Sequence, residues 1–125
     1  WGRPDMAPFI FTDSILKEKP IKVFNFGKMK RDFTYIDDVI EAIFKCCKKP
    51  AQSNPKFNKL DPDPSTSDAE FRILNLGNSN SIKLMQFINC LEKQIGLEAK
   101  KEYLPAQPGD IEQTIANTER LSQYY

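Results

Sequence analysis

Two side chains of this sequence have the clearest capacity to bind a ligand. Arg31 ends a basic segment, and its planar guanidinium can donate two parallel hydrogen bonds to phosphate oxygens, which lysine cannot reproduce. Asp110 closes the turn Gln107-Pro108-Gly109-Asp110, and a carboxylate can accept hydrogen bonds from two adjacent ribose hydroxyls. Each residue is therefore a candidate binding residue.

Each of the two also has a structural interpretation. Arg31 could form a surface ion pair with Asp32 or Asp37, worth about 0–1 kcal/mol, and residue type alone favours that interpretation. Asp110 could instead cap a helix or a turn, a common role of aspartate in a Pro-Gly-Asp sequence. The residue types leave both alternatives open.

The stretch from Pro20 to Val39 contains the elements that would position such groups. Ile21–Phe24 is strand-like, Gly27 marks a turn, Phe33–Ile36 is β-branched and aromatic, and Asp37 begins a helical pattern. In α/β folds, elements of this kind hold polar groups at the edge of a sheet.

Hydrophobic periodicity predicts helices on both sides of this stretch. Residues 36–47 follow a 3.6-residue period, with Thr34 and Asp37 resembling a capping box. Residues 1–19 contain a second helical pattern. We expect the apolar face of that helix to consist of Met6, Phe9, Ile10 and Leu16.

The second half of the chain continues the alternation of strands and helices. Residues 51–70 show no period and predict a mobile surface loop, and 71–76 alternate as in a strand. Ser79 or Ser81 could cap a helix that Gly96 ends. A short strand at 101–104, an extended piece at 114–116 and a last helix capped by Asn117 or Thr118 follow. The pattern predicts an α/β fold with some parallel pairing.

Composition excludes several classes of function. The 125 residues fit one domain, and the net charge of +1 disfavours nucleic acid as a partner. No apolar run is long enough to span a membrane. Cys46, Cys47 and Cys90 lie in helical patterns and fit reduced thiols in a cytoplasmic protein. Without histidine, the chain has no His-based triad or zinc site.

Two motifs resemble a known family. Trp1-Gly2-Arg3-Pro4-Asp5-Met6-Ala7 and Arg31-Asp32-Phe33-Thr34-Tyr35-Ile36-Asp37-Asp38 are similar to extended short-chain dehydrogenase/reductase enzymes that act on nucleotide sugars, and most similar to UDP-glucuronate 4-epimerases. The resemblance spans essentially all 125 residues, with a looser match at 51–70. It implies that residues 1–125 form a single small C-terminal substrate-binding domain, and that the NAD-binding Rossmann domain would precede it.

The same resemblance implies roles at the nucleotide end of a UDP-sugar. Arg31 would bind the diphosphate and Asp110 the ribose. Lys22 and Phe24 would hold the uracil mostly through main-chain groups, and Ile82 would form an apolar wall, although without the family Phe24 and Ile82 look like core residues.

Two further positions follow from the resemblance. Arg3 would meet the carboxylate of the sugar, although a solvated arginine is an equally good interpretation. Gln107 stands where many relatives carry arginine, so it can hydrogen-bond a phosphate without neutralising it. Arg31 would then carry more of the charge.

Missing motifs define what the chain is expected not to do. No glycine-rich GxxGxxG turn is present, and no tyrosine is followed four residues later by lysine. The resemblance implies that a full-length enzyme, a homodimer, uses NAD to oxidise C4, rotates the keto sugar and returns the hydride. We expect this chain alone to bind neither NAD nor a metal and to be inactive. The rival hypotheses are another epimerase, dehydratase or decarboxylase of the superfamily, and a non-catalytic interaction module.

Overall fold

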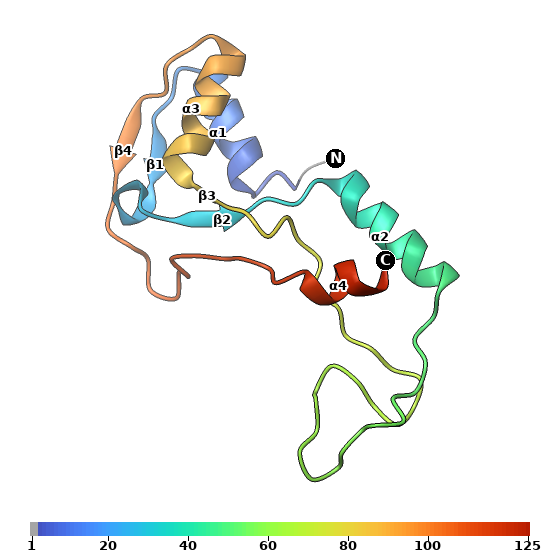
Figure 1. The fold of residues 1–125 in the computed structure, drawn as a ribbon. Coiled ribbons are helices and arrows are strands. Elements are labelled where there is room, and N and C mark those ends of the chain that lie inside the picture. Colours follow the sequence, from blue (N-terminus) through green and yellow to red (C-terminus); the bar gives the residue numbers. More distant parts are fainter. Residues whose placement is uncertain (1–2) are drawn as a thin grey trace. The chain divides into compact units, whose positions relative to one another are not determined.

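The computed structural model describes residues 3–125 as helices joined by short strands (Figure 1). In chain order the elements are α1 (Ala7–Leu16), β1 (Ile21–Val23), the 3-10 helix η1 (Phe24–Gly27), β2 (Lys30–Asp32), α2 (Ile36–Lys48), β3 (Ser81–Lys83), α3 (Leu84–Ile95), β4 (Lys101–Tyr103) and α4 (Glu119–Tyr124). This alternation of helices and strands confirms the predicted α/β fold class. No helix of the described part is long and apolar enough to cross a membrane.

Contacts divide the chain into two compact units. The first unit, called the sheet unit here, contains the described residues up to Arg31 and Ser81–Thr114. The second, called the loop unit, contains Asp32–Asn80 and Ile115–Tyr125. All seven candidate site residues lie in the sheet unit.

The core of the sheet unit lies between two helices and a parallel pair of strands. β1 pairs with β4, with Ile21 opposite Lys101 and Val23 opposite Tyr103. Figure 1 shows α1 and α3 side by side next to these strands. The buried core cluster consists of Phe11, Ile15, Ile21, Val23, Ile88 and Ala99. The pairing confirms the predicted strands at 21–24 and 101–104 and the predicted parallel geometry.

A tight turn connects β1 to β2. Asn25, Phe26 and Gly27 have φ values of 49°, 49° and 77°, all in the left-handed region. Glycine fits such a conformation best, and a Cβ on Gly27 would come within 2.7 Å of the Met85 sulfur on α3. The predicted turn at Gly27 is therefore confirmed, and its packing against α3 explains why the residue is small.

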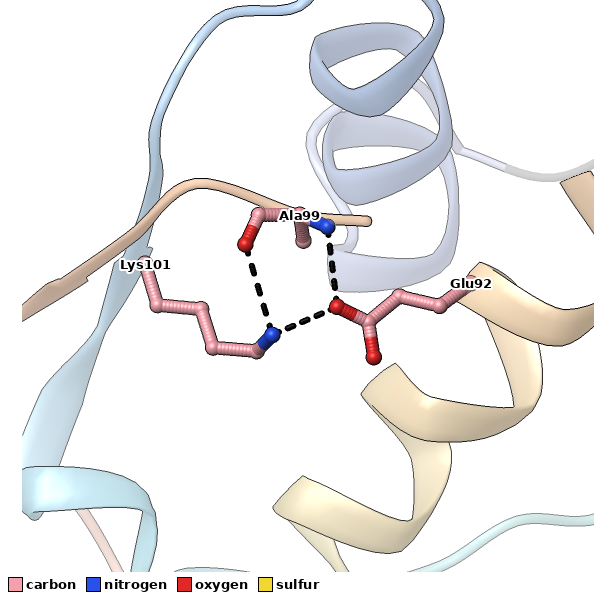
Figure 2. Close-up of polar contacts among 3 residues, drawn as sticks. All are labelled: Glu92, Ala99 and Lys101. Atoms are coloured by element: carbon pink, nitrogen blue, oxygen red, sulfur yellow. Dashed lines mark hydrogen bonds and ion pairs between the residues drawn. The ribbon is translucent and has the colours of Figure 1, made fainter. Parts of the chain in front are cut away.

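An ion pair fastens the C-terminal end of α3 to the start of β4 (Figure 2). Glu92 Oε1 accepts hydrogen bonds from Ala99 N at 2.8 Å and from Lys101 Nζ at 2.5 Å. The two charged side chains are only 17% and 16% exposed. These contacts, first that with Lys101 and then that with Ala99, hold the pKa of Glu92 below its usual value.

This carboxylate should make the stability of the sheet unit depend on pH. Because folding lowers the pKa of Glu92, its contribution is present above the unfolded-state pKa of about 4.3 and is lost as pH falls through the folded-state pKa. Urea unfolding should therefore show Glu92→Gln less stable than the wild type at pH 7, with the difference shrinking in acid. Glu98→Gln removes an exposed carboxylate and serves as the control. A difference between wild type and Glu92→Gln that stays constant with pH would contradict this role.

A single carboxylate organises the loop unit. Asp32 accepts hydrogen bonds from the main-chain amides of Asn78 at 3.0 Å, Ser79 at 3.2 Å and Ala116 at 2.9 Å. Next to it, a Cβ on Gly77 would lie 2.4 Å from the Ala116 Cβ and 3.0 Å from Asp32 Oδ2. Asp32 therefore joins two loops that lie far apart in the sequence.

The predicted face of α1 is wrong. The residues expected to be apolar contacts are largely exposed: Met6 49%, Phe9 51%, Ile10 44% and Leu16 60%. Phe11 and Ile15 are buried instead, one turn apart on the face that meets α3 and β1. α1 carries apolar residues on several faces, so packing against the neighbouring elements selects the buried one.

Several local predictions also differ from the structure. Residues 33–35 and 71–76 form no named strand, and only Arg72 makes an isolated bridge, with Thr66. The residues at 114–116 form no strand either. Propensity alone therefore overestimates strand where no paired partner is available.

The helix starts differ as well. α2 begins after Tyr35 without a side-chain cap, so the proposed Thr34–Asp37 capping box is absent. α3 begins after Lys83, whose amide bonds the Gln86 side chain at 3.2 Å, and neither serine is its cap. Short strand β3 occupies the position where the serine cap was expected. The other ends are as predicted: Gly96, with φ 79°, ends α3, and Asn117 Oδ1 accepts from Glu119 N at the start of α4.

Candidate functional site

Strand β2 presents the arginine that is the centre of the candidate site. Arg31 Nη1 donates to Lys30 O at 2.8 Å and to Glu112 O at 3.3 Å, and Nη2 lies 4.0 Å from the Met29 sulfur. The side chain is half-buried, and within the described part of the sheet unit it makes no ion pair. Neutral acceptors thus orient the guanidinium, and no carboxylate of the described part of the sheet unit pairs with it.

The surface-pair interpretation of Arg31 is therefore not supported by its contacts. Asp32, one of the two carboxylates considered as its partner, accepts the three main-chain amides described above. An orientation set by carbonyl oxygens suits an arginine that binds an anion, because such acceptors position the side chain without neutralising it.

The turn that carries Gln107 and Asp110 is closed by main-chain atoms. Asp110 N donates to Gln107 O at 3.1 Å, and Gly109 has φ 86°. Both side chains are exposed, and neither makes a hydrogen bond with other residues of the described chain. Since the turn does not use the Asp110 carboxylate, the interpretation of this residue as a turn cap is not supported.

Main-chain hydrogen bonds bring this turn to the arginine. Lys30 N donates to Glu112 O at 2.9 Å, and Thr114 N donates to Lys30 O at 3.3 Å. The segment after the turn therefore runs as a parallel partner of β2, two residues beyond Asp110. Arg31 reaches the same carbonyl, Glu112 O, with its side chain. The structure thus brings the candidate diphosphate residue and the candidate ribose residue to neighbouring segments of one unit.

Ile82 lies on the strand next to Arg31. It is the central residue of β3, which pairs with β2, and Leu84 N donates to Met29 O at 2.8 Å just beyond. Its side chain is half-buried and is not a member of the core cluster. This position is compatible with an apolar wall beside β2.

Lys22 and Phe24 lie along β1 and at its end. Ile21 N and Val23 O bond to the β4 side, to Lys100 O and Leu104 N. Because the main-chain groups of a strand alternate in direction, those of Lys22 face the edge away from β4. The Lys22 side chain is exposed and Phe24 is half-buried outside the core cluster. A free strand edge can offer main-chain groups to a planar ligand.

Arg3 is not brought to these residues by any described contact. It forms an exposed ion pair with Asp5 at 2.5 Å, with 74% and 59% of the two side chains exposed. The hydrogen bond from Arg3 lowers the pKa of Asp5. Trp1 and Gly2, which begin the same motif, lie outside the described residues.

Sequence reasoning missed one member of the site, the carbonyl oxygen of Glu112. This oxygen accepts from both Lys30 N and Arg31 Nη1. A main-chain acceptor carries no signal in residue type, so only the fold could identify it. Arg31 and Asp110, in contrast, could be predicted because their side chains have distinctive chemistry.

A metal ion and NAD would each need a characteristic set of protein groups. Residues 3–125 contain no group of three or more histidine, cysteine, aspartate or glutamate side chains placed to hold a metal ion. The glycines within residues 3–125 form no glycine-rich turn between a strand and a helix of the kind that cradles a dinucleotide pyrophosphate.

Comparison with known proteins shows which protein family the chain resembles. A sequence model of the NAD dependent epimerase/dehydratase family matches residues 2–58. Protein CapI of Staphylococcus aureus is 47% identical over 121 residues, which are 97% of this chain and 36% of that protein. Residues 2–58 of the chain thus resemble the NAD dependent epimerase/dehydratase family, and the chain spans about a third of the length of the curated relatives that it matches.

Two further matches are named as one kind of enzyme. A probable UDP-glucuronate 4-epimerase of Rhizobium meliloti is 39% identical over 125 residues, covering 97% of this chain and 36% of that protein. The crystal structure of UDP-glucuronic acid 4-epimerase from Bacillus cereus in complex with UDP-glucuronic acid and NAD matches with a TM-score of 0.74 and 30% identity, covering 98% of this chain and 35% of that one. The fold and the sequence of this chain are thus similar to a segment of these two proteins.

Proposed function

We propose that this chain is the UDP-sugar-binding portion of an NAD-dependent nucleotide-sugar epimerase that interconverts UDP-glucuronate and UDP-galacturonate. The observation that carries the proposal is the Arg31 guanidinium, which two carbonyl oxygens orient and no carboxylate of its unit neutralises. The relatives named UDP-glucuronate 4-epimerases support the choice of substrate.

The diphosphate and the ribose are assigned to the two segments that meet at β2. Arg31 binds the diphosphate with its remaining N–H donors. Asp110 accepts hydrogen bonds from the ribose hydroxyls, a role its unused carboxylate permits. Gln107, in the same turn, donates a hydrogen bond to the diphosphate and adds no charge. Arg31 therefore supplies the positive charge on this side of the ligand.

The uracil is assigned to the free edge of β1. Main-chain groups of Lys22 and Phe24 bond the polar edge of the base, and Ile82 provides apolar contact beside the nucleotide. None of these roles needs an unusual side chain, which agrees with the exposure of Lys22 and the half-buried positions of Phe24 and Ile82.

Arg3 is assigned to the sugar carboxylate. In the free chain Asp5 occupies its guanidinium. An exposed pair of this kind is worth about 0–1 kcal/mol, so a substrate carboxylate could replace Asp5 at small cost. Arg3 is then a residue that could distinguish an acidic sugar from a neutral one.

Catalysis and NAD binding belong, in this proposal, to polypeptide outside this sequence. NAD supplies hydride transfer chemistry when it is bound. This chain holds the nucleotide, and binding energy from that remote part helps to orient the reacting sugar carbon. We infer that residues 1–125 act as one substrate-binding domain with the 51–70 loop at its surface, that an upstream Rossmann domain completes the enzyme, and that the chain is inactive by itself. The complete enzyme is proposed to be a cytoplasmic homodimer.

Binding of UDP to the 15N-labelled chain tests the proposal. Titration should shift the amide signals of Phe24, Arg31, Ile82 and Asp110. Arg31→Gln should weaken the affinity about ten- to a hundredfold, because hydrogen bonds to a charged group contribute roughly 1.5–3 kcal/mol. Lys93→Gln removes an equal charge from the exposed surface of α3 and should leave the affinity unchanged. A folded spectrum without shifts would favour the interaction-module hypothesis.

The reaction itself requires a longer protein. Fusing the chain to the NAD-binding part of a relative should give an enzyme that turns over UDP-glucuronate in preference to UDP-glucose. Turnover of UDP-glucose alone would reassign the chain to another epimerase of the superfamily, and a decarboxylated or dehydrated product would reassign it to those reactions.

A further inference from the structure

A cavity in the loop unit has no role in the proposed function. Its volume is about 440 Å³, and it opens between the 51–70 loop, the residues that follow this loop and α4. All of its lining residues belong to the loop unit, whereas the proposed UDP site lies in the sheet unit. Its size is within the range of small-molecule sites.

The wall of this cavity carries a cation without a counter-ion. The guanidinium of Arg72 lies over the ring of Tyr124, 3.6 Å from its centre. Arg72 is half-buried, and its Nη1 is buried with no hydrogen-bond partner in the described part of the chain. None of the ion pairs among residues 3–125 includes Arg72. The Tyr124 ring contacts this cation but does not neutralise it, so an anion in the cavity would stabilise the half-buried charge.

The other charges of the wall neutralise each other. Arg120 Nη2 lies 2.9 Å from Asp63 Oδ2. Asp63 also accepts hydrogen bonds from Ser65 N at 3.0 Å and Ser65 Oγ at 2.8 Å. These contacts, with Ser65 the largest contributor, lower the pKa of Asp63, which therefore remains ionised at neutral pH. Arg72 leaves the lining with one net positive charge.

The 51–70 loop is held in shape by its own hydrogen bonds. Asn54 N donates to Ser67 O at 2.8 Å, and Asn54 Nδ2 donates to Thr66 Oγ1 at 3.2 Å. Ile73 N donates to Ser65 O at 2.9 Å and closes the loop at its far end. A wall that is already formed reduces the entropy lost when a ligand binds.

We propose that this cavity binds a polar anion about the size of a hexose, a sugar that carries a carboxylate or a phosphate. Arg72 meets the anionic group. Gln52 and Gln123 also line the cavity, and the amide of a glutamine side chain can bond hydroxyl groups. The ligand needs no nucleotide, and the site is independent of Arg31.

Titration of the 15N-labelled full chain tests this site. A free hexuronate and a hexose 1-phosphate are added separately at constant ionic strength, with a neutral hexose as the control. At least one of the anions should shift the amide signals of Thr66, Arg72 and Gln123, whereas the neutral hexose should not. The anion that binds shows whether the anionic group of the natural ligand is a carboxylate or a phosphate. The proposal is overturned if neither anion shifts these signals or if the neutral sugar shifts them equally.

Matched variants separate the site from general electrostatics. Arg72→Gln should weaken binding about tenfold, whereas Lys59→Gln, which removes a charge from the same loop outside the cavity, should not. If Arg72→Gln does not fold, Gln123→Leu replaces an exposed residue of the wall and should still weaken binding severalfold. Unchanged affinity in both cavity variants would refute the site. Arg31→Gln should impair UDP binding alone, so failure of this proposal and failure of the UDP proposal are distinguishable.

Discussion

Asp32→Asn is expected to lower the free energy of unfolding of the loop unit by about 3 kcal/mol. The substitution keeps the size of the side chain but removes its charge and one of its two acceptors. Oδ2 accepts from Ser79 N and Ala116 N, and Oδ1 accepts from Asn78 N. In asparagine an NH2 group takes one of these positions, so at least one main-chain amide would face another donor.

Hydrogen exchange can locate this effect. The amides of Asn78, Ser79 and Ala116 should exchange faster in Asp32→Asn, together with a lower urea midpoint of the loop unit. Asp61→Asn makes the same change of charge at an exposed loop position and should alter stability by no more than about 0.5 kcal/mol. Equal effects of the two substitutions would mean that the contacts of Asp32 contribute nothing beyond its charge.

Ile88→Ala should destabilise the sheet unit by roughly 2–5 kcal/mol. Ile88 is 0% exposed and lies in the cluster formed by α1, α3 and β1. Removing three of its carbons loses burial and leaves a cavity that the neighbours can fill only in part. All the residues proposed to bind the nucleotide belong to this unit, so UDP affinity should fall together with stability.

Urea unfolding followed by signals of the sheet unit measures this loss. Ile88→Val should cost roughly 0.5–1.5 kcal/mol, and Leu97→Ala, at a position 41% exposed and outside the cluster, should cost less than Ile88→Ala. A unit-specific probe is needed because two units can unfold separately. If Ile88→Ala and Leu97→Ala had equal effects, the core would not be centred on Ile88.

Local patterns predicted the elements of this fold better than the faces on which they pack. The 3.6-residue period identified α2, Gly96 marked the end of α3, and the apolar strand before Gly27 identified β1. The same information misplaced the buried face of α1, because the choice between Phe9 and Phe11 depends on contacts with α3 and β1. Short strands were also overpredicted at 71–76, where the chain makes one bridge only.

The candidate site shows a similar limit. Arg31 and Asp110 could be proposed from chemistry, and the structure shows that they lie on neighbouring segments. Asp32 was considered only as an ion partner of Arg31, and its hydrogen bonds to three amides were not foreseen. Those partners are main-chain groups up to 84 positions away along the sequence, and residue types do not encode them.

The close approach of Gly77 to Ala116 predicts how sequence variation at the two positions must be linked. A methyl group at 77 would overlap the methyl group of Ala116, which cannot retreat while its amide is bonded to Asp32. Alanine at 77 is therefore harmful in this sequence, and glycine at 116 would remove the more severe of its two close contacts. The two positions form an epistatic pair: the effect of one substitution depends on the residue at the other, and the order in which the changes arise decides whether a lineage passes through a stable intermediate.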